Sequence, residues 1–438
     1  MTHFKNISDN IYGALWEKAS QNVDKEIVIG QDLIQAAAPI LSPDDLLSGV
    51  DALLNGWLTD GKYCKEFELG LAKYIGCRYV SLVNSGSSAN LIAFASLTSP
   101  KLRERAIKPG DEVITVAAGF PTTVNPIVQY GCIPVFIDVD INTCNISTKN
   151  IEAAITDKTK AIVLAHSLGN PFNIDEIKKL TDKYNLWLIE DNCDALGATY
   201  GGQKTGSFGD LATLSFFPAH QITAGEGGAV LINNPRLKKI IDSMRNWGKD
   251  CWCIPGDDNT CGTRFTQKHH QLPEGYDHKY VFSHVGYNLK MTEMQAAVGL
   301  NQLSKINDFV EKRRKNHSKL ETLFSEFKDF FILPSITDNT SPSWFGFLLI
   351  CKDDRINRND ITNFLNSKQI GTRLFFAGNL TKQPAYAEVN YKVAGNLENT
   401  DKLMNDAFWL GVWPGLNDTH LEYMYSSTKN YLKEKGLI

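Results

Sequence analysis

The segment GSFGDLATLSFFPAHQITAGEGGAV, residues 206–230, is the part of the sequence that says most about the fold. Its apolar run LATLSFF (211–217) leads into a polar loop centred on His220, and glycines then open a second apolar run, GAVLI (228–232). Short apolar runs rich in β-branched residues and bounded by glycine are typical of strands buried on both faces. The segment therefore predicts two buried strands with an imidazole in the loop between them.

Five similar runs precede this segment and alternate with amphipathic, helix-patterned stretches. They are RYVSLV (78–83), EVITV (112–116), IPVFIDV (133–139), KAIVLA (160–165) and LWLIE (186–190). Strands that alternate with helices indicate an α/β domain with a mostly parallel sheet. Ligands of such sheets bind beyond the carboxyl ends of the strands, so the residues after each run are the candidates for a site.

Composition is that of an ordinary globular protein of 438 residues, with 43% hydrophobic and 21% charged side chains. The 45 basic and 49 acidic residues give a net charge of −4 without an evident basic block, so we expect no nucleic-acid or anionic-membrane partner. The apolar runs are too short to span a bilayer, and the first residues do not read as a secretory signal. We therefore expect a cytoplasmic protein.

Three regions are predicted from the pattern. Residues 1–50 suggest a helical N-terminal arm, 51–310 a large cofactor-binding domain, and 311–438 a smaller C-terminal domain of mixed α and β segments. The large domain includes a long polar, cysteine-containing stretch at 249–285. One or two long helices are expected within 292–327.

Three strand ends carry candidate site residues. After the first run, Gly86, Ser87 and Ser88 open a helix whose N-terminus suits a phosphate, although a capped turn without a ligand is equally compatible. Asp191 follows LWLIE; it can hold a pyridine nitrogen protonated, or it can simply cap a helix. Phe120 precedes Pro121 and can stack on a planar cofactor or pack in the core.

These motifs, in this order, resemble the fold-type I pyridoxal-phosphate (PLP) enzymes, and among them the DegT/DnrJ/EryC1 family of aminotransferases and dehydrases acting on nucleotide-linked ketosugars. The resemblance covers about residues 50–430. It implies cofactor-phosphate contacts from the 86–88 loop and Ser215, ring stacking by Phe120, and Asp191 on the pyridinium nitrogen. It also implies a homodimer in which Asn288 reaches the phosphate of the neighbouring subunit.

Two positions depart from the aminotransferases of this family. Asp194 stands near the cofactor hydroxyl, where a glutamine is often found, and His220 stands at the place of the lysine that bonds covalently to PLP. A histidine cannot form that stable bond, so the resemblance implies a non-covalently held pyridoxamine phosphate (PMP). Imidazole, with an ordinary pKa near 6.5, suits proton transfer at neutral pH. The expected chemistry is loss of the C3 hydroxyl of a 4-keto sugar after His220 removes a proton from C4′ of the cofactor.

Cysteines 193, 251, 253 and 261 are candidate ligands of a metal or cluster. Four thiolates suit a 2Fe–2S cluster as well as zinc, and spacing alone slightly favours zinc or a disulfide. The cysteine spacing and the histidine together resemble the iron–sulfur branch of the family's 3-dehydrases, which deoxygenate CDP-4-keto-6-deoxyhexoses. That branch implies a 2Fe–2S cluster reduced by an NADH-dependent iron–sulfur flavoprotein reductase, with a 3,6-dideoxy sugar as product.

Other interpretations stay open at this point. The chain suits a non-redox 3-dehydratase or an aminotransferase-like protein with a structural metal in the cysteine loop. It also suits an iron–sulfur sensor that has kept a PMP-binding scaffold. The remaining five cysteines are expected to be structural, and His269 and His270 to be solvent-exposed loop residues.

Overall fold

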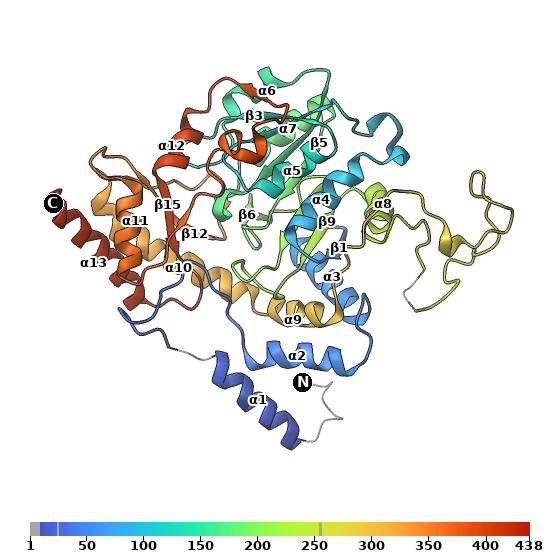
Figure 1. Cartoon of the computed structure of the whole chain (residues 1–438), viewed down its shortest axis with the longest axis horizontal. Helices are drawn as coiled ribbons and strands as arrows, with labels where there is room; N and C mark the ends of the chain where they lie inside the picture. The colour runs from blue at the N-terminus through green and yellow to red at the C-terminus, as the bar shows by residue number, and fades with distance from the viewer. Residues whose placement is uncertain (1–8, 24–25, 254–255) are drawn as a thin grey trace.

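The computed structural model describes residues 9–23, 26–253 and 256–438 (Figure 1). Parts of two predicted regions lie outside the described residues, namely 1–8 and 24–25 of the N-terminal arm and 254–255 of the cysteine-containing stretch. No described helix has the length and apolar character needed to cross a membrane.

An eight-stranded sheet forms the centre of the molecule, in the order β1-β9-β8-β5-β4-β2-β3-β14. All neighbouring strands run parallel except for the pairs that β9 makes with β1 and β8, so only β9 is reversed. The strands are β1 (Tyr79–Val83), β2 (Glu112–Val116), β3 (Ile133–Ile137), β4 (Thr159–Ala165), β5 (Trp187–Asp191), β8 (Leu211–Ser215), β9 (Gly228–Ile232) and β14 (Lys392–Ala394). The α/β fold with a mostly parallel sheet is confirmed, and each of the seven predicted runs contains a strand.

Helices cover both faces of this sheet, as buried parallel strands require. One face packs Ile114, Ile162 and Leu188 against α7 (Ile174–Tyr184). The other face packs alternate strand residues, such as Val113 and Ile189, against three further helices. These are α4 (Gly86–Leu97), α5 (Pro121–Gln129) and α8 (Pro235–Arg245). Apolar residues on both sides of each strand explain why the runs are continuous rather than alternating.

The N-terminal and connecting helices lie along one side of the large sheet (Figure 1). Figure 1 shows α1 (Asp9–Val23) beside α2 (Pro43–Leu54), which in turn lies against α9 (Glu293–Leu303). The stretch predicted to form one or two long helices contains α9 and then α10 (Ile306–Phe324). Helix α10 runs from the large sheet into the C-terminal region. Helix α3 (Lys62–Ile75) packs on β1.

The C-terminal region contains an antiparallel sheet in the order β10-β12-β15-β13. Its strands are β10 (Phe331–Ile332), β12 (Gly346–Cys351), β13 (Arg373–Leu374) and β15 (Ala407–Gly411), and its helices are α11 (Arg358–Ser367), α12 (Glu398–Asp406) and α13 (Asp418–Glu434). Strand β14 lies within 311–438 but pairs with β3 at the edge of the large sheet. Short elements complete the chain: α6 (Ile151–Ala154) and a three-stranded sheet of β6 (Thr199–Tyr200), β7 (Gln203–Lys204) and β11 (Thr340–Ser341).

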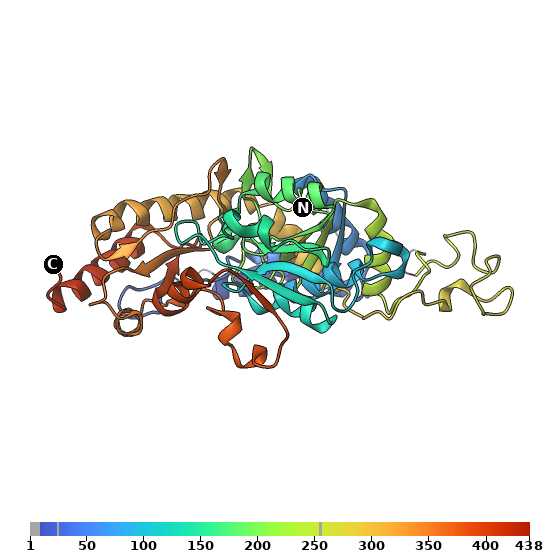
Figure 2. The same cartoon turned by 90° about the horizontal axis from the view of Figure 1, so that it is seen from above.

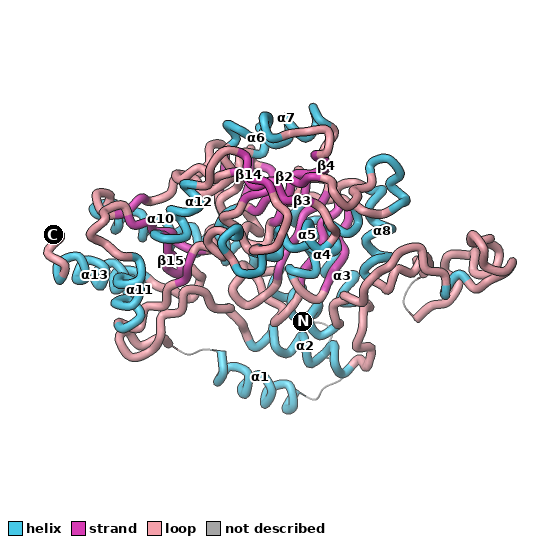
Figure 3. The backbone as a smooth tube through the Cα atoms, turned by 45° about the horizontal axis from the view of Figure 1, so that its top comes forward, coloured by secondary structure: helices cyan, strands magenta, loops and turns pink. Residues whose placement is uncertain are grey.

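The cysteine-containing stretch between α8 and α9 is an extended arm. It leaves and returns at one place, where bridges join Asn246 to Asn288 and Lys249 to Phe282. Figures 1 and 2 show it reaching away from the rest of the chain in two perpendicular views, and Figure 3 shows it to be almost entirely loop. Below, this segment is called the arm (residues 249–285).

Candidate active site

The first strand end forms an anion-binding cradle. Helix α4 begins at Gly86, and its N-cap Ser85 accepts a hydrogen bond from the backbone N–H of Ser88. The N–H groups of Gly86 and Ser87 lie in the first helical turn, where they have no helical acceptor and where the helix dipole favours a negative charge. Gly86 is buried and Ser87 is exposed. The Ser88 hydroxyl donates to the side-chain oxygen of Asn84 at 2.7 Å, so Ser88 also holds the preceding loop in place.

Gly86 lies directly against Ser215 at the end of β8. A Cβ atom on Gly86 would come within 2.5 Å of the Ser215 Cβ and 2.9 Å of its hydroxyl. The close approach brings two predicted phosphate-binding residues from different strand ends into one cradle. Only a glycine permits this spacing.

We expect Gly86→Ala to weaken binding of PLP or PMP at least tenfold, because the new methyl group must displace Ser215. Overpacking of this kind lowers the free energy of unfolding by about 1–3 kcal/mol. Cofactor titration followed by absorbance, together with thermal unfolding, measures both effects. Gly13→Ala is the control, since nothing lies within 4 Å of a Cβ there. Wild-type cofactor affinity in Gly86→Ala would show that the cradle does not hold the phosphate.

Asp191, the last residue of β5, is buried in a network of donors. Its Oδ2 accepts from Asn90 at 2.8 Å and from Thr123 at 2.7 Å, while its Oδ1 accepts from the backbone N–H of Cys193 at 3.2 Å. The Thr213 hydroxyl donates to Asn90 Oδ1 at 2.7 Å and completes the network. A carboxylate held by several donors is fixed in direction.

Asn90, Thr123 and Thr213 are site residues that sequence reasoning did not single out. Asn90 stands four residues after Gly86 on α4, so both lie on the same side of that helix. This spacing within NSGSSAN was the available signal. Thr123 in α5 and Thr213 in β8 carried no comparable signal, because ordinary threonines occur throughout such elements.

Phe120 lies at the start of α5, directly before Pro121, and its side chain is 51% exposed. The core-packing interpretation of this residue is therefore wrong. Its carbonyl accepts from the Thr123 N–H at 3.1 Å, so the turn that presents the Phe120 ring also places a partner of Asp191. An exposed ring at this strand end remains available to a planar ligand.

Asp194 and His220 face each other in the interior of the site. His220 Nδ1 lies 3.5 Å from Asp194 Oδ1, and the two side chains are 14% and 13% exposed. Within the described chain, His220 Nδ1 and Asp194 Oδ2 have no hydrogen-bond partner. Two buried polar atoms without partners at the end of a parallel sheet indicate room for a polar ligand.

Burial keeps this pair neutral. Burial, followed by the charge of Asp191, raises the pKa of Asp194 to about 8, and burial, followed by the charge of Arg313, lowers the pKa of His220 to about 4. These shifts favour a protonated carboxyl and a neutral imidazole near pH 7.

Asn288 lies outside its own chain's cradle. It is exposed, and its side-chain oxygen accepts from Lys290 at 2.7 Å. The next residue, Leu289, accepts from the Asn84 N–H at 2.9 Å, which places this segment beside the loop that leads to Gly86. Among the described residues, Asn288 makes no side-chain hydrogen bond to a predicted cofactor-binding residue of its own chain.

The four candidate cysteines are divided between two places. Cys193 is next to Asp191, and its thiol lies 3.9 Å from the Thr213 hydroxyl. Cys251, Cys253 and Cys261 lie together on the arm: burial opposes ionisation of Cys253, but hydrogen bonds from the Cys261 backbone and the Cys251 thiol lower its pKa to about 7. Figures 1 and 2 show the arm extending away from the large sheet, which contains β5. No group of three or more potential metal ligands among the described residues has the geometry of a metal site.

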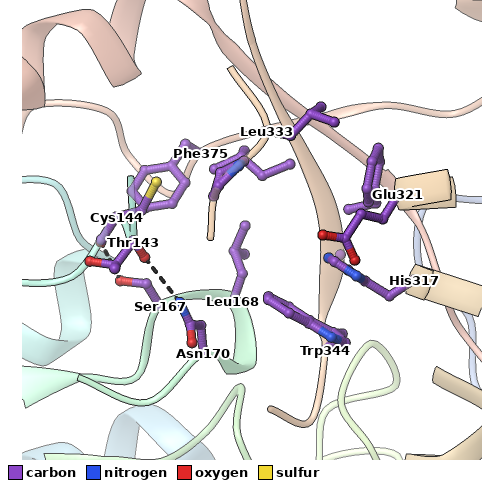
Figure 4. A pocket seen from close by; sticks show the side chains of 14 residues that line it. Thr143, Cys144, Ser167, Leu168, Asn170, His317, Glu321, Leu333, Trp344 and Phe375 are labelled. Carbon is purple, nitrogen blue, oxygen red and sulfur yellow. Dashed lines mark hydrogen bonds between the residues drawn. The ribbon is translucent and has the colours of Figure 1, made fainter. Parts of the chain in front are cut away.

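A small cavity lies apart from these residues, between the large sheet and the C-terminal region (Figure 4). His317 of α10, Trp344, Leu168 and Phe375 are among its lining residues. Its volume of ≈ 20 Å³ is enough for about one water molecule, so it is far too small for a nucleotide sugar. It belongs to the seam between the two parts of the chain.

Comparison with known proteins places this arrangement in a family. The model of the DegT/DnrJ/EryC1/StrS aminotransferase family matches residues 44–429. The chain belongs to this family. Its members have the fold-type I architecture seen here.

Two curated relatives cover nearly the whole family domain. The chain is 54% identical to the lipopolysaccharide biosynthesis protein RfbH of Salmonella typhimurium over 408 residues, covering 93% of each protein. It is 48% identical to the dTDP-4-dehydro-2,6-dideoxy-D-glucose 3-dehydratase of Saccharopolyspora spinosa over 429 residues, covering 98% of this chain and 93% of the relative.

A solved structure of the family has the same architecture. The GDP-4-keto-6-deoxy-D-mannose-3-dehydratase of E. coli, with bound hydrated PLP, superposes with a TM-score of 0.81 at 30% identity. The match covers 92% of this chain and all of the other. A PLP-type cofactor is thus consistent with the family and with the donors found here: the cradle suits its phosphate, and the buried Asp191 carboxylate suits its ring nitrogen.

Proposed function

We propose that this protein is a PMP-dependent 3-dehydratase of nucleotide-linked 4-keto-6-deoxy sugars. The observation that carries the proposal is the buried His220, whose unpartnered Nδ1 lies 3.5 Å from Asp194, at the place where the family resemblance puts a lysine. The same reaction class is supported by two 3-dehydratases: the Saccharopolyspora spinosa enzyme, which is similar in sequence, and the E. coli enzyme, which is similar in structure.

The residues of the site divide the work of binding. Gly86, Ser87, Ser88 and Ser215 would hold the cofactor phosphate, Phe120 would cover the ring, and Asp191 would keep the ring nitrogen protonated. Asn288 would reach the phosphate of a second copy of the chain, since it lies outside its own cradle. When bound, PMP supplies an amine for the ketone and a ring that takes up electrons.

The remaining steps belong to the Asp194–His220 pair. His220, neutral at physiological pH, removes a proton at C4′ of the cofactor. The carboxyl of Asp194 carries a proton at the same pH and is the candidate donor to the departing C3 hydroxyl, which leaves as water. The sum of these transfers is dehydration, with no oxidant or reductant consumed.

Substrate assays test this proposal. Purified protein with PMP is incubated with CDP-, GDP- and dTDP-4-keto-6-deoxyhexoses, and loss of the C3 hydroxyl is followed by mass spectrometry. We expect dehydration with one of them and no transamination when glutamate is added. Transamination without dehydration would favour the aminotransferase alternative, and inactivity towards all three would contradict the proposal.

We further propose that the substrate is CDP-4-keto-6-deoxy-D-glucose and that the product is reduced to a 3,6-dideoxy sugar. The reduction would use a 2Fe–2S cluster and electrons from an NADH-dependent iron–sulfur flavoprotein reductase. Cysteines 193, 251, 253 and 261 support it by type: Cys193 lies beside Asp191 and Thr213, and the other three lie together on the arm.

The arm also exposes large apolar side chains, which include Trp252 (49%), Phe265 (56%) and Phe282 (54%). Exposed aromatic residues on an extended segment are typical of a surface that another chain covers. We propose that a second copy brings its arm over Cys193 and completes the cluster.

Mixed dimers distinguish the two arrangements of the thiols. A chain with Cys193→Ser keeps the arm thiols, and a chain with Cys253→Ser keeps Cys193. Each homodimer should bind no cluster, whereas the tagged, isolated heterodimer should bind one cluster per dimer, measured as iron and sulfide under anaerobic conditions. Cys351→Ala, in the C-terminal sheet, is the control with full iron content. Iron-free wild-type protein would exclude the cluster, and an iron-free heterodimer would exclude its assembly from two chains.

A further inference from the structure

Arg313 is a buried cation in the seam between the two parts of the chain. It lies on α10, is 1% exposed, and donates to four backbone carbonyls. Its Nη2 reaches the carbonyls of Ala219 at 3.4 Å and His220 at 3.1 Å, and its Nη1 reaches those of Trp344 at 3.2 Å and Phe345 at 3.5 Å. One guanidinium therefore joins the loop that carries His220 to the segment that enters β12.

Neighbouring contacts join the same two segments. Gln221, next to His220, donates to the Ser343 carbonyl at 3.0 Å. The Phe345 ring lies 5.2 Å from the imidazole of His220. One turn further along α10, His317 stacks on Trp344 with ring centroids 3.7 Å apart, and Figure 4 shows these two rings side by side. The planar fork of arginine suits several fixed acceptors at once, which a lysine cannot match.

We propose that Arg313 is the positioning residue of the base: it holds the His220 loop against residues 344–345. This inference rests on the proposed role of His220 as a proton acceptor. Because residues 344–345 lead into the C-terminal sheet, the clamp also ties the position of the base to that part of the chain.

The charged groups facing His220 come from three elements. Asp194 lies 3.5 Å away in the loop after β5, Asp191 ends that strand, and Arg313 approaches from α10. Burial lowers the pKa of His220, the Arg313 charge lowers it further, and the Asp191 charge opposes them. Loss of the Arg313 charge should therefore raise the pKa of His220. An imidazole with a higher pKa becomes protonated at a higher pH, and once protonated it can no longer act as a base.

Two variants separate the charge from the hydrogen bonds. Arg313→Met removes both, whereas Arg313→Lys keeps the charge but loses the fork. Arg314→Met is the matched control. Arg314 is the next residue of α10 and also donates to a backbone carbonyl, that of Pro342 at 2.8 Å, but among the described residues it does not hydrogen-bond to the His220 loop. Full-length protein is used throughout, without cofactor for the exchange measurements and with PMP for the activity measurements.

Hydrogen–deuterium exchange at histidine C2, resolved by peptide mass spectrometry, reports the pKa of His220 without substrate. We expect Arg313→Met to raise it by about one unit, and Arg313→Lys and Arg314→Met to leave it unchanged. Backbone amide exchange of residues 217–224 should become at least tenfold faster in both Arg313 variants and stay unchanged in Arg314→Met. An unchanged pKa in Arg313→Met or unchanged amide exchange overturns the proposal; if Arg313→Met does not fold, amide exchange of Arg313→Lys decides it.

Activity then tests the consequence. The acidic limb of kcat/KM should move to higher pH in Arg313→Met, and Arg313→Lys should lower kcat at least tenfold with little change in KM. A wild-type pH profile in Arg313→Met, or a wild-type kcat in Arg313→Lys, would contradict the positioning role of Arg313. If wild-type protein dehydrates none of the sugars offered, the proposed function fails, but the pKa and amide-exchange comparisons still judge the clamp.

Discussion

His220→Lys will lose dehydration of the 4-keto sugar by at least about 10²-fold, the lower range for removal of a general base. A lysine at this position bonds covalently to PLP, so the free amine of the cofactor is no longer available to the ketone. The new side chain also enters a buried pocket beside Asp194, whose raised pKa reflects how poorly that pocket accommodates charge. Sugar turnover and the mass of the borohydride-treated protein measure the two effects.

His220→Asn is the comparison that isolates the base. Asparagine is neutral and polar, cannot take a proton at neutral pH, and forms no bond to PLP. We expect it to bind the cofactor reversibly and to be as inactive in dehydration as His220→Lys. Full activity of either variant would show that another group removes the proton, and that the pairing with Asp194 is only structural.

Asp191→Asn will have the second large effect. The amide retains the shape and the contacts with Asn90 and Thr123 but lacks the charge that favours a protonated pyridine ring. Loss of a neighbouring opposite charge reduces the protonated fraction of the pyridine nitrogen by about 10- to 10³-fold, and turnover should fall in proportion. The ultraviolet absorption of bound cofactor reports ring protonation independently of turnover.

Asp182→Asn is the control for this substitution. Asp182 is 71% exposed and pairs with Lys178 on the surface of α7, where an ion pair contributes about 0–1 kcal/mol. It should leave cofactor absorption and turnover unchanged. Asp191→Asn with the absorption spectrum and turnover of the wild type would remove the carboxylate from the proposed mechanism.

The strands of the large sheet were predictable because their signal is local. Runs such as EVITV and GAVLI are apolar on both sides, and this composition fits only a strand covered on both faces. Strand β14 was not predicted, since its residues are largely exposed and it is defined by its partner β3 rather than by its own composition. For Phe120 the sequence left stacking on a cofactor and core packing both open, because an aromatic residue in a strand–helix turn has the same sequence signal whether it is covered or exposed.

For the candidate site, too, some features were predictable from local sequence and others were not. The sequence by itself determined the α/β class, the strand ends, and the residue types placed there, because each rests on spacing along a few consecutive residues. Only the tertiary structure decided which distant groups meet: Asn90 and Thr123 on Asp191, Asp194 opposite His220, Arg313 behind the base, and Cys193 apart from the arm. Such contacts depend on the packing of α5 and α10 and on the path of a long loop, and residues far apart in the chain leave no local pattern that records them.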